Sequence, residues 1–394
     1  MAIKTISDIS VRNKLVLYRA AYDVPLRKHG SSYLVHDDSR IVATLPTIRK
    51  LLRENCRIVI LTWAGRPKGK KVASLRTDPI ARRLSKLLRH PVRKLDDCVG
   101  GQVEKEVKRL KPREIVVLEN VRFHFEEDQK DPRFIRQLSR LGEVWVFDAF
   151  AQAHRDVASI VGPPRFLPSV AGLLLEKELS TLGRLLKNPR RPFVAILGGA
   201  KIATRAKLIA NLKLKADRIL LGGALANTVL LSKGQPVGDS LVEPAMVLTI
   251  RKLKLKEPRV LWPRDVVVGQ SLKSRSGTIR ITQAVKDDDI ILDVGPGTIK
   301  DFTAVVRAAK TIVWNGPMGY FENPAFRHGT MALAKAVGHS RAEVIIGGGD
   351  TEDALSETNM LKKVDFVSTG GGAMLHYLAG EKLPGILALD SKKK

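Results

Sequence analysis

"VIIGGGDTEDAL", residues 344–355, is an apolar run that meets three glycines and then an acidic stretch compatible with a helix. Glycine inside a regular element loses much conformational entropy on folding, so Gly347, Gly348 and Gly349 need a physical reason. One reason is that a backbone without Cβ atoms lets another molecule approach closely. The N–H groups of a helix that opens near Asp350 would also point back at the glycines and favour an anion there. The stretch predicts a buried strand, a phosphate-facing loop and the start of a helix.

The same order of residue types occurs three more times in the second half of the chain. "VAILGGAKIA" (194–203), "RILLGGALAN" (218–227) and "FVSTGGGAML" (366–375) each place two or three glycines between an apolar run and a helix-compatible stretch. None of them matches the Walker P-loop G-x-x-x-x-G-K-[ST] or the dinucleotide pattern G-x-G-x-x-G. Together the junctions predict several phosphate-facing loops along one sheet edge, and hence a phosphorylated ligand whose identity they leave open.

Short apolar runs alternate with helix-length segments along the whole chain. Runs that are apolar on both faces and spaced in this way are typical of parallel sheets covered by helices on both sides. Between the halves, "AGLLLEKELSTLGRLLKNPRRP" (171–192) is helix-compatible until Pro189. The sequence therefore predicts an α/β fold of two lobes joined by one helix. The expected strands are "KLVLYRA" (14–20), "RIVILTW" (57–63), "EIVVLEN" (114–120), "EVWVFDA" (143–149), "FVAILGG" (193–199), "RILLGG" (218–223), "DIILDVG" (289–295), "TIVWNG" (311–316), "EVIIGGG" (343–349) and "FVSTGG" (366–371).

Length and composition fit a globular protein with more than one core. The chain has 394 residues, of which 44% are hydrophobic, and it contains no apolar run of transmembrane length. "MAIKTISDIS" lacks the features of a signal peptide. With Cys56 and Cys98 as its two cysteines, a disulfide framework is not expected, and their spacing matches no metal motif. The composition predicts a cytoplasmic protein that does not enter a membrane.

The charge is unusual, with 68 Lys+Arg against 40 Asp+Glu and a net charge of +28. Such an excess raises the question of a nucleic-acid partner. The chain has no zinc finger, no RNA-binding aromatic signature and only 5% aromatic residues. "ARRLSKLLRH" (81–90) has its leucines on one helical face and its basic residues largely on the other, which is typical of a solvated amphipathic helix. We interpret the excess as mainly compositional, with some attraction of anionic substrates, and expect no specific nucleic-acid binding.

The order of motifs resembles the phosphoglycerate kinase family over nearly the whole chain. This resemblance implies two Rossmann-like, doubly wound parallel-sheet lobes and a monomer. The implied division is a phosphoglycerate-binding lobe at 1–170, an interdomain helix at 171–188 and a nucleotide-binding lobe at 189–379, with the tail 380–394 packing back on the first lobe. The motifs are "YRAAYDVPL" (18–26), "LTWAGRP" (61–67), "LENVRFHFEE" (118–127), "DAFAQAHR" (148–155), "VGPPRFLPSVAGLLLEKEL" (161–179), "RPFVAILGGAKI" (191–202), "LLGGALANT" (220–228), "DVGPGTI" (293–299), "IVWNGPMGYFE" (312–322), "IIGGGDT" (345–351) and "STGGGA" (368–373).

The reaction implied by the resemblance is reversible phosphoryl transfer between 1,3-bisphosphoglycerate and ADP, giving 3-phosphoglycerate and ATP in glycolysis. This chemistry requires in-line positioning and positive charge around the moving group, and it needs no nucleophile from the enzyme. Arginine suits the anionic substrate because its planar fork binds two oxygens at once. Arg40 would lie closest to the transferred phosphoryl group, and His154 fits either a ligand or a structural residue. The implied phosphoglycerate-binding residues are Ala21, Tyr22, Asp23, Arg40, Trp63, Arg66, Arg122, His154 and Arg155.

On the nucleotide side, the resemblance implies that Lys201 reaches the phosphates and that Glu322 accepts hydrogen bonds from the ribose. Asp350 would hold Mg²⁺, directly or through water, and Gly371 and Gly372 would offer a second helix N-terminus. The implied nucleotide-binding residues are Lys201, Arg205, Gly295, Asn315, Glu322, Gly348, Gly349, Asp350 and Thr351. The implied catalytic set is Arg40, Lys201, Gly349 and Gly371.

The first substrate loop departs from the family pattern of Arg, a small residue, Asp, an aromatic residue, Asn, Val and Pro. Here Ala21 replaces the acid, Tyr22 is the aromatic residue and Asp23 replaces the amide. The expected histidine of the second loop is Trp63, which cannot accept a hydrogen bond. Four further departures are Phe147 for Asn, Thr204 for Asp, Arg205 for Lys and Ala224 for the last glycine of a triple.

Two hypotheses follow from these departures. In the first, the chain is an active phosphoglycerate kinase with compensating contacts, as the retained Arg40, Lys201 and Asp350 suggest. In the second, it is a catalytically weakened relative that binds nucleotide or nucleic acid, as Ala21 and Trp63 suggest. We favour the first, because a chain released from catalysis has no reason to keep all three retained residues.

Overall fold

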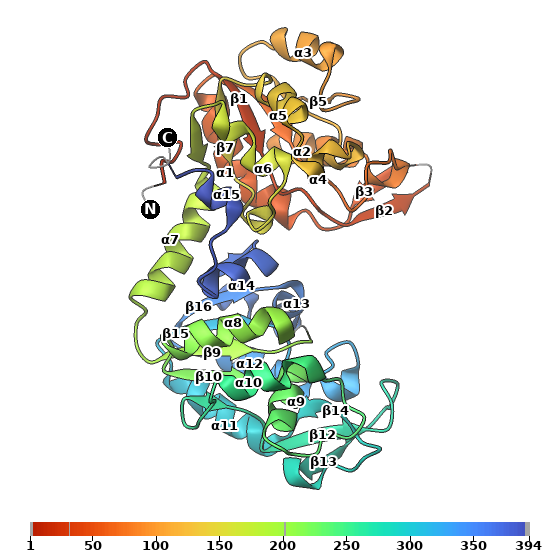
Figure 1. Cartoon of the computed structure of the whole chain (residues 1–394), viewed down its shortest axis with the longest axis vertical. Helices are drawn as coiled ribbons and strands as arrows, with labels where there is room; N and C mark the ends of the chain where they lie inside the picture. Colours follow the sequence, from red (N-terminus) through yellow and green to blue (C-terminus); the bar gives the residue numbers. More distant parts are fainter. Residues whose placement is uncertain (1–2, 31, 201, 391–394) are drawn as a thin grey trace. The chain divides into compact units, whose positions relative to one another are not determined.

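The computed structural model describes residues 3–30, 32–200 and 202–390, with the backbone alone for 202–204 (Figure 1). It divides into two compact units, formed by 3–180 with 382–390 and by 181–381. Helix α7 (Leu173–Lys187) contains the boundary between them. Among the described residues, none of the helices has the length and apolar composition needed to cross a bilayer.

The first unit is built on a six-stranded parallel sheet with the strand order β5-β6-β4-β1-β7-β8. Its central strand β1 is buried along its whole length, so both faces of the sheet are covered. The strands are β1 (Leu15–Arg19), β4 (Arg57–Leu61), β5 (Val92–Lys94), β6 (Ile115–Val117), β7 (Val144–Phe147) and β8 (Ser169–Ala171). The helices are α1 (Ser39–Arg53), α2 (Asp78–Leu88), α3 (Gly101–Lys108), α4 (Glu126–Gln129), α5 (Pro132–Ser139), α6 (Ala158–Val161) and α15 (Pro384–Leu387).

Helix α2 shows how local sequence sets these elements. Asp78 and Pro79 occupy its first turn, where a negative charge and a missing N–H are both tolerated. Its C-cap, Arg89, adopts a left-handed conformation with φ 53°. Leu84 is buried while Arg82 is exposed, so the predicted amphipathic helix is confirmed.

The C-terminal segment packs within the first unit. The backbone N–H of Gly385 in α15 donates to the carbonyl of Ala153 at 2.9 Å. A Cβ on Gly385 would lie 2.9 Å from the Phe147 ring, so helix and ring are in close contact. The large apolar side chain at 147 therefore has a packing role.

The second unit holds another six-stranded parallel sheet, in the order β11-β10-β9-β15-β16-β17. Its strands are β9 (Phe193–Leu197), β10 (Arg218–Leu221), β11 (Val260–Leu261), β15 (Thr311–Asn315), β16 (Glu343–Gly347) and β17 (Phe366–Ser368). The helices are α8 (Ile202–Lys213), α9 (Gly223–Ser232), α10 (Val247–Lys252), α11 (Pro296–Ala308), α12 (His328–Gly338), α13 (Gly349–Glu357) and α14 (Gly372–Leu378). The predicted α/β class with two parallel sheets in separate lobes is confirmed.

One predicted strand belongs to a different sheet. "DIILDVG" forms β14 (Ile290–Val294), which pairs antiparallel with β12 (Asp265–Gly269) in a three-stranded sheet completed by β13 (Thr278–Ile281). Its inclusion among the parallel strands was wrong, because a short apolar run does not reveal the direction of its partner. The exposed hairpin of β2 (Leu26–His29) and β3 (Ser32–Val35) was also not anticipated.

Candidate active site

The first group of predicted site residues gathers at one edge of the first sheet. Loops that follow parallel strands emerge at the same edge, which is where open α/β sheets bind ligands. Arg40 joins them from the first turn of α1. The residues that follow the strands are Ala21, Tyr22 and Asp23 after β1, Trp63 and Arg66 after β4, Arg122 after β6, and His154 and Arg155 after β7.

Asp23 connects two of these loops and orients Arg40. Its Oδ1 accepts a hydrogen bond from the N–H of Gly65 at 2.8 Å. Its backbone carbonyl accepts another from Nη1 of Arg40 at 2.7 Å. The carboxylate that replaces the expected amide therefore fixes the loops around Arg40.

Trp63 lies against two guanidinium groups. Cζ of Arg122 is 3.8 Å from the centroid of the indole ring, and Cζ of Arg19 is 4.4 Å from it. The ring is only 2% exposed, and such desolvated cation–π contacts are worth roughly 2 kcal/mol or more. Nη1 of Arg122 also donates to the carbonyl of Gly65 at 2.9 Å. The residue that replaces the expected histidine thus holds Arg122 in place.

Arg19 is a member of this cluster that sequence reasoning missed. It is fully buried, and its Nε donates to Oγ of Ser159 at 3.1 Å. Ser159 in turn donates its N–H and hydroxyl to the buried carboxylate of Glu127, at 2.8 and 2.6 Å. Burial lowers the pKa of Arg19 to about 9, although the charge of Glu127 opposes this shift and that of Arg122 reinforces it. A lone arginine at the end of an otherwise apolar strand was the signal available in the sequence.

The remaining predicted residues of this lobe differ in accessibility. Tyr22 is buried, its hydroxyl lies 2.6 Å from Oγ1 of Thr44, and burial raises its pKa. Its side chain packs in the core of the first unit and so anchors the loop that carries it. Ala21 is also buried. By contrast, Arg66 and Arg155 are exposed, while Arg40, Arg122 and His154 are partly exposed.

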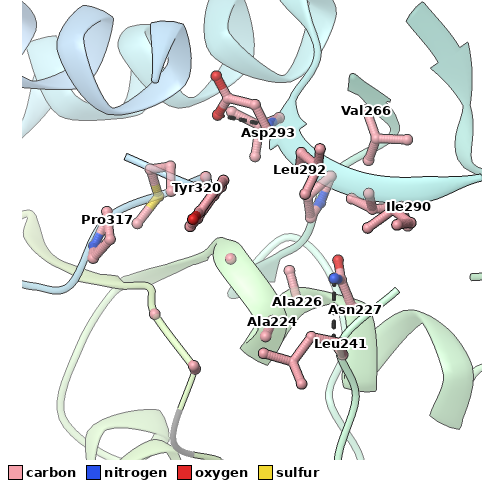
Figure 2. A pocket seen from close by; sticks show the side chains of 18 of the residues that line it. Ala224, Ala226, Asn227, Leu241, Val266, Ile290, Leu292, Asp293, Pro317 and Tyr320 are labelled. Carbon is pink, nitrogen blue, oxygen red and sulfur yellow. Dashed lines mark hydrogen bonds between the residues drawn. The ribbon is translucent and has the colours of Figure 1, made fainter. Parts of the chain in front are cut away.

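In the second unit, a cavity of about 520 Å³ lies beside three of the four glycine junctions, those at 194–203, 218–227 and 344–355 (Figure 2). Apolar side chains from α9, β14 and the segment after β15 form most of its wall, among them Ala226, Leu292 and Pro317. Four acidic residues also line it: Asp293 is buried, whereas Asp239, Glu322 and Asp350 are exposed. An apolar cavity with a few acceptors at its rim suits a flat base with an attached sugar.

The four glycine junctions all form strand-to-helix turns, as predicted, but their glycines serve two purposes. Some allow close packing: a Cβ on Gly198 would lie 1.9 Å from the carbonyl oxygen of Pro317. Others are open, since a Cβ on Gly349 or Gly372 would meet no atom within 4 Å. Gly348, with φ +103°, and Gly371, with φ +46°, adopt conformations that side chains rarely permit and directly precede α13 and α14. The open group leaves the N-termini of α13 and α14 uncovered, and helix N-termini favour anions.

Arg205 and Asn315 fix the loops beneath these helix starts. Nη2 of Arg205 donates to Oδ1 of Asn315 at 3.0 Å, and Nδ2 of Asn315 donates to the carbonyl of Gly347. Burial lowers the pKa of Arg205, and the nearby charge of Asp350 opposes that shift. The hydroxyl of buried Thr351 accepts the N–H of Gly316 at 2.9 Å. Asn315 and Thr351 therefore act within the loop framework.

Gly295 does not line the cavity: a Cβ there would lie 2.4 Å from the carboxyl group of Asp265, so its position indicates tight packing and gives no support for nucleotide contact. Lys201 lies outside the described residues, as does the side chain of Thr204. Ala224, where a glycine was expected, lines the cavity.

Comparison with known proteins places this geometry in a family. The family model described as phosphoglycerate kinase matches residues 6–381. The chain belongs to the phosphoglycerate kinase family. It is 45% identical to the phosphoglycerate kinase of Moorella thermoacetica and 44% identical to that of Pelotomaculum thermopropionicum, with 100% of each chain covered in both comparisons.

Solved structures of the family agree with this assignment. Phosphoglycerate kinase from Coxiella burnetii matches with a TM-score of 0.86, 37% identity and 100% coverage of both chains. The enzyme from Pyrococcus horikoshii OT3 matches with a TM-score of 0.84, 31% identity and 98% coverage of both. The predicted family, kinase class and phosphoglycerate kinase function are confirmed. The alternative of a weakened relative is not favoured.

Proposed function

We propose that the two lobes divide the phosphoglycerate kinase reaction between them. The first lobe binds 3-phosphoglycerate or 1,3-bisphosphoglycerate, and the second binds ATP or ADP. The observation that carries this proposal is the Arg40–Asp23–Gly65 linkage, because it supports an oriented cation at the ligand-binding edge of the first sheet. The retained arginines supply the positive charge that phosphoryl transfer requires.

In the first lobe, the proposed roles follow from accessibility. Arg66 and Arg155 are exposed and bind the phosphate of phosphoglycerate, together with Arg122 and His154. Arg40 donates to the equatorial oxygens of the moving phosphoryl group, where negative charge must be stabilised in the transition state. Asp23, Trp63 and Tyr22 act as positioning residues, because their side chains hold neighbouring loops.

In the second lobe, we assign the apolar cavity to the adenosine part of the nucleotide. Glu322 at its rim accepts hydrogen bonds from the ribose hydroxyls. The N–H groups at the starts of α13 and α14, reached past Gly348, Gly349, Gly371 and Gly372, bind phosphate oxygens. We assign Lys201 to the nucleotide phosphates from its position in the sequence motif. Arg205 and Asn315 hydrogen-bond to each other and stabilise the loops.

The nucleotide is bound with Mg²⁺, and Asp350 is the residue we assign to the metal. Its carboxylate is exposed, lines the cavity and stands in the first turn of α13 next to open Gly349. A hard oxygen donor at this point fits Mg²⁺, which favours carboxylates and phosphate oxygens. When bound, the metal neutralises charge on the nucleotide phosphates.

We extend the proposal to the location, the oligomeric state and the partners of the protein. We assign the chain to the cytoplasm as a monomer, with its substrates as its specific partners. The net charge of +28 contributes attraction of anionic substrates, and any contact with nucleic acid is non-specific and sensitive to salt.

A coupled assay tests the proposed function. The purified chain receives 3-phosphoglycerate and Mg-ATP, and formation of 1,3-bisphosphoglycerate is followed through NADH oxidation by glyceraldehyde-3-phosphate dehydrogenase. We expect turnover that depends on both substrates and on the metal. Absence of turnover in the unmodified chain, together with its appearance in an Ala21→Asp, Asp23→Asn double variant, would mean that the edited loop has abolished activity.

A further inference from the structure

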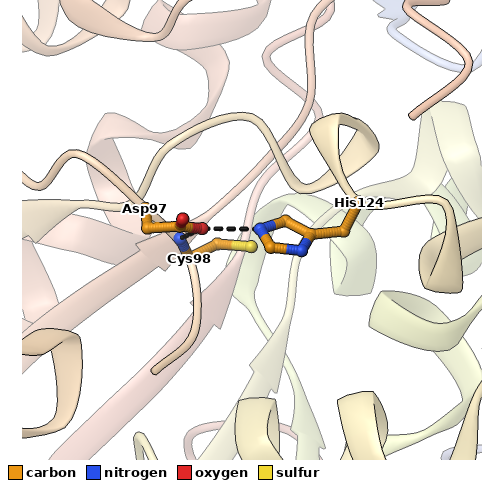
Figure 3. Close-up of side chains that lie close together, drawn as sticks. All are labelled: Asp97, Cys98 and His124. Carbon is orange, nitrogen blue, oxygen red and sulfur yellow. Dashed lines mark hydrogen bonds and ion pairs between the residues drawn. The ribbon is translucent and has the colours of Figure 1, made fainter. Parts of the chain in front are cut away.

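Three side chains with different metal-binding atoms, none of which is assigned a role above, converge in the first unit. Asp97 and Cys98 lie between β5 and α3, and His124 follows the short 3-10 turn Val121–Phe123 (Figure 3). Nε2 of His124 lies 2.6 Å from Oδ1 of Asp97. The carboxylate oxygen, the Cys98 sulfur and the imidazole nitrogen all lie within 4.8 Å of one another. Figure 3 shows the sulfur on the same side of the imidazole as Asp97.

The arrangement is held by its surroundings. The backbone N–H of Cys98 donates to Oδ1 of Asp97 at 2.7 Å, which fixes one neighbour relative to the other. The His124 ring packs against Phe134 with centroids 5.2 Å apart. Cys98 is fully buried, whereas the side chains of Asp97 and His124 are 34% and 23% exposed. A small ion can therefore reach the cluster from the solvent side.

The mixture of donor atoms discriminates between cations. Mg²⁺ and Ca²⁺ prefer oxygen ligands alone, whereas Zn²⁺ accepts sulfur, nitrogen and oxygen at about 2.0–2.3 Å. Tetrahedral bonds of that length separate ligand atoms by roughly 3.3–3.8 Å. The three ligand atoms lie within 4.8 Å of one another, and the distances between them therefore differ from these values by about an ångström or less. Side-chain movements of that size would bring the atoms into tetrahedral positions around one ion. Lys71, whose Nζ is 3.6 Å from Oδ2 of Asp97, is 69% exposed and can turn toward solvent.

We propose that Asp97, Cys98 and His124 form a binding site for a thiophilic divalent cation, of which Zn²⁺ fits best, with water as the fourth ligand. On binding, the Cys98 thiol releases its proton to solvent, and the neutral imidazole keeps its proton on Nδ1 so that Nε2 can bind the metal. Because His124 follows Arg122 by two residues, a bound cation would also fix the loop that carries this arginine.

The competing explanation is a hydrogen-bonded Asp97–His124 pair that only holds two loops together. That explanation does not involve the Cys98 sulfur. An experiment that detects a bond between the metal and this sulfur therefore distinguishes the two explanations. The untagged full chain is titrated with Co²⁺, and the near-ultraviolet thiolate-to-cobalt absorption is recorded. We expect one equivalent to give this band and Zn²⁺ to displace it. Absence of the band would overturn the proposal.

Matched variants locate the site. Cys98→Ser should abolish the band and weaken Zn²⁺ binding at least tenfold in competition with a chromophoric chelator. Cys56→Ser is the matched control, since Cys56 is also a buried free cysteine. It should change neither the band nor Zn²⁺ binding, because the Cys56 sulfur contacts the carbonyl of Val11 at 3.0 Å and belongs to no metal-ligand cluster among the described residues. A band that survives Cys98→Ser, or that is lost in Cys56→Ser, would contradict the assignment. If Cys98→Ser fails to fold, X-ray absorption of the zinc-loaded unmodified chain decides: we expect one sulfur at about 2.3 Å, and a shell of nitrogen and oxygen alone overturns the site.

Discussion

The guanidinium carbon of Arg122 lies 3.8 Å from the centroid of the Trp63 ring, and Arg19 approaches the same ring at 4.4 Å. A residue that departs from the family pattern is thus in contact with an arginine that we propose binds the substrate. The contact suggests that the edited loops of this chain compensate for lost polar groups by fixing their arginines.

Removing the ring should therefore impair phosphoglycerate binding. Trp63→Ala removes a desolvated cation–π contact of roughly 2 kcal/mol, so KM for 3-phosphoglycerate should rise about 30-fold, with a smaller effect on KM for ATP. Steady-state kinetics measure both. Trp145→Phe is the control, because Trp145 is buried in β7 and packs against Phe147. Equal increases in both KM values after Trp63→Ala would indicate general loss of structure.

Asp23 combines a hydrogen bond to the Gly65 loop with a negative charge in the proposed phosphoglycerate site. Asp23→Asn keeps an oxygen for the Gly65 N–H and removes the negative charge near an anionic ligand, so KM for 3-phosphoglycerate should fall severalfold. Asp23→Ala loses the hydrogen bond as well, and we expect lower kcat because the loop that orients Arg40 is released. A rise in KM for the Asn variant would show that the carboxylate charge itself is needed.

Asp350 should act through the metal. Calorimetric titration of the full chain with ADP should show that Asp350→Ala weakens binding at least tenfold in the presence of Mg²⁺ and much less in its absence. Asp353→Ala, at an exposed position on the same helix, is the matched control. Equal losses in both conditions would remove the metal role from Asp350.

The buried carboxyl group of Asp148 should make the free energy of unfolding depend on pH. Burial raises its pKa to about 6, opposed by hydrogen bonds from donors that include Thr47 and Tyr18. The folded state therefore holds this proton more tightly than the unfolded state does. Its contribution to stability is complete below pH about 4 and is lost as the pH rises through about 6. Asp148→Asn should flatten the free energy of unfolding over this window in denaturant titrations. Asp156→Asn, at an exposed position, should leave it as steep as in the unmodified chain.

Several features of the fold and site were accessible from sequence because they depend on local patterns. The four glycine junctions could be located since each combines a buried run with a helix start. The direction of β14 could not, because its antiparallel partner β12 is distant and gives no local signal. The packing role of Gly295 was hidden for the same reason, as it arises from contact with Asp265.

The cluster of Asp97, Cys98 and His124 illustrates the same limit at the level of function. No spacing rule connects 97–98 with 124, and only the parallel order of β5 and β6 brings the segments together. Likewise, the sequence alone indicated that Trp63 removes a hydrogen-bond acceptor, whereas in the structure its ring lies against two arginines. Such substitutions can be interpreted only when the neighbours of the new side chain are known.

The kcat of Arg40→Ala tests the central claim most directly, because Arg40 is the cation assigned to the transferred phosphoryl group. Loss of a cationic donor that acts in the transition state should lower kcat by on the order of 10³ or more. The effect on KM for 3-phosphoglycerate should be smaller, since ground-state binding is shared with other arginines. Turnover equal to that of the unmodified chain, measured in the coupled assay at saturating substrates, would contradict the account.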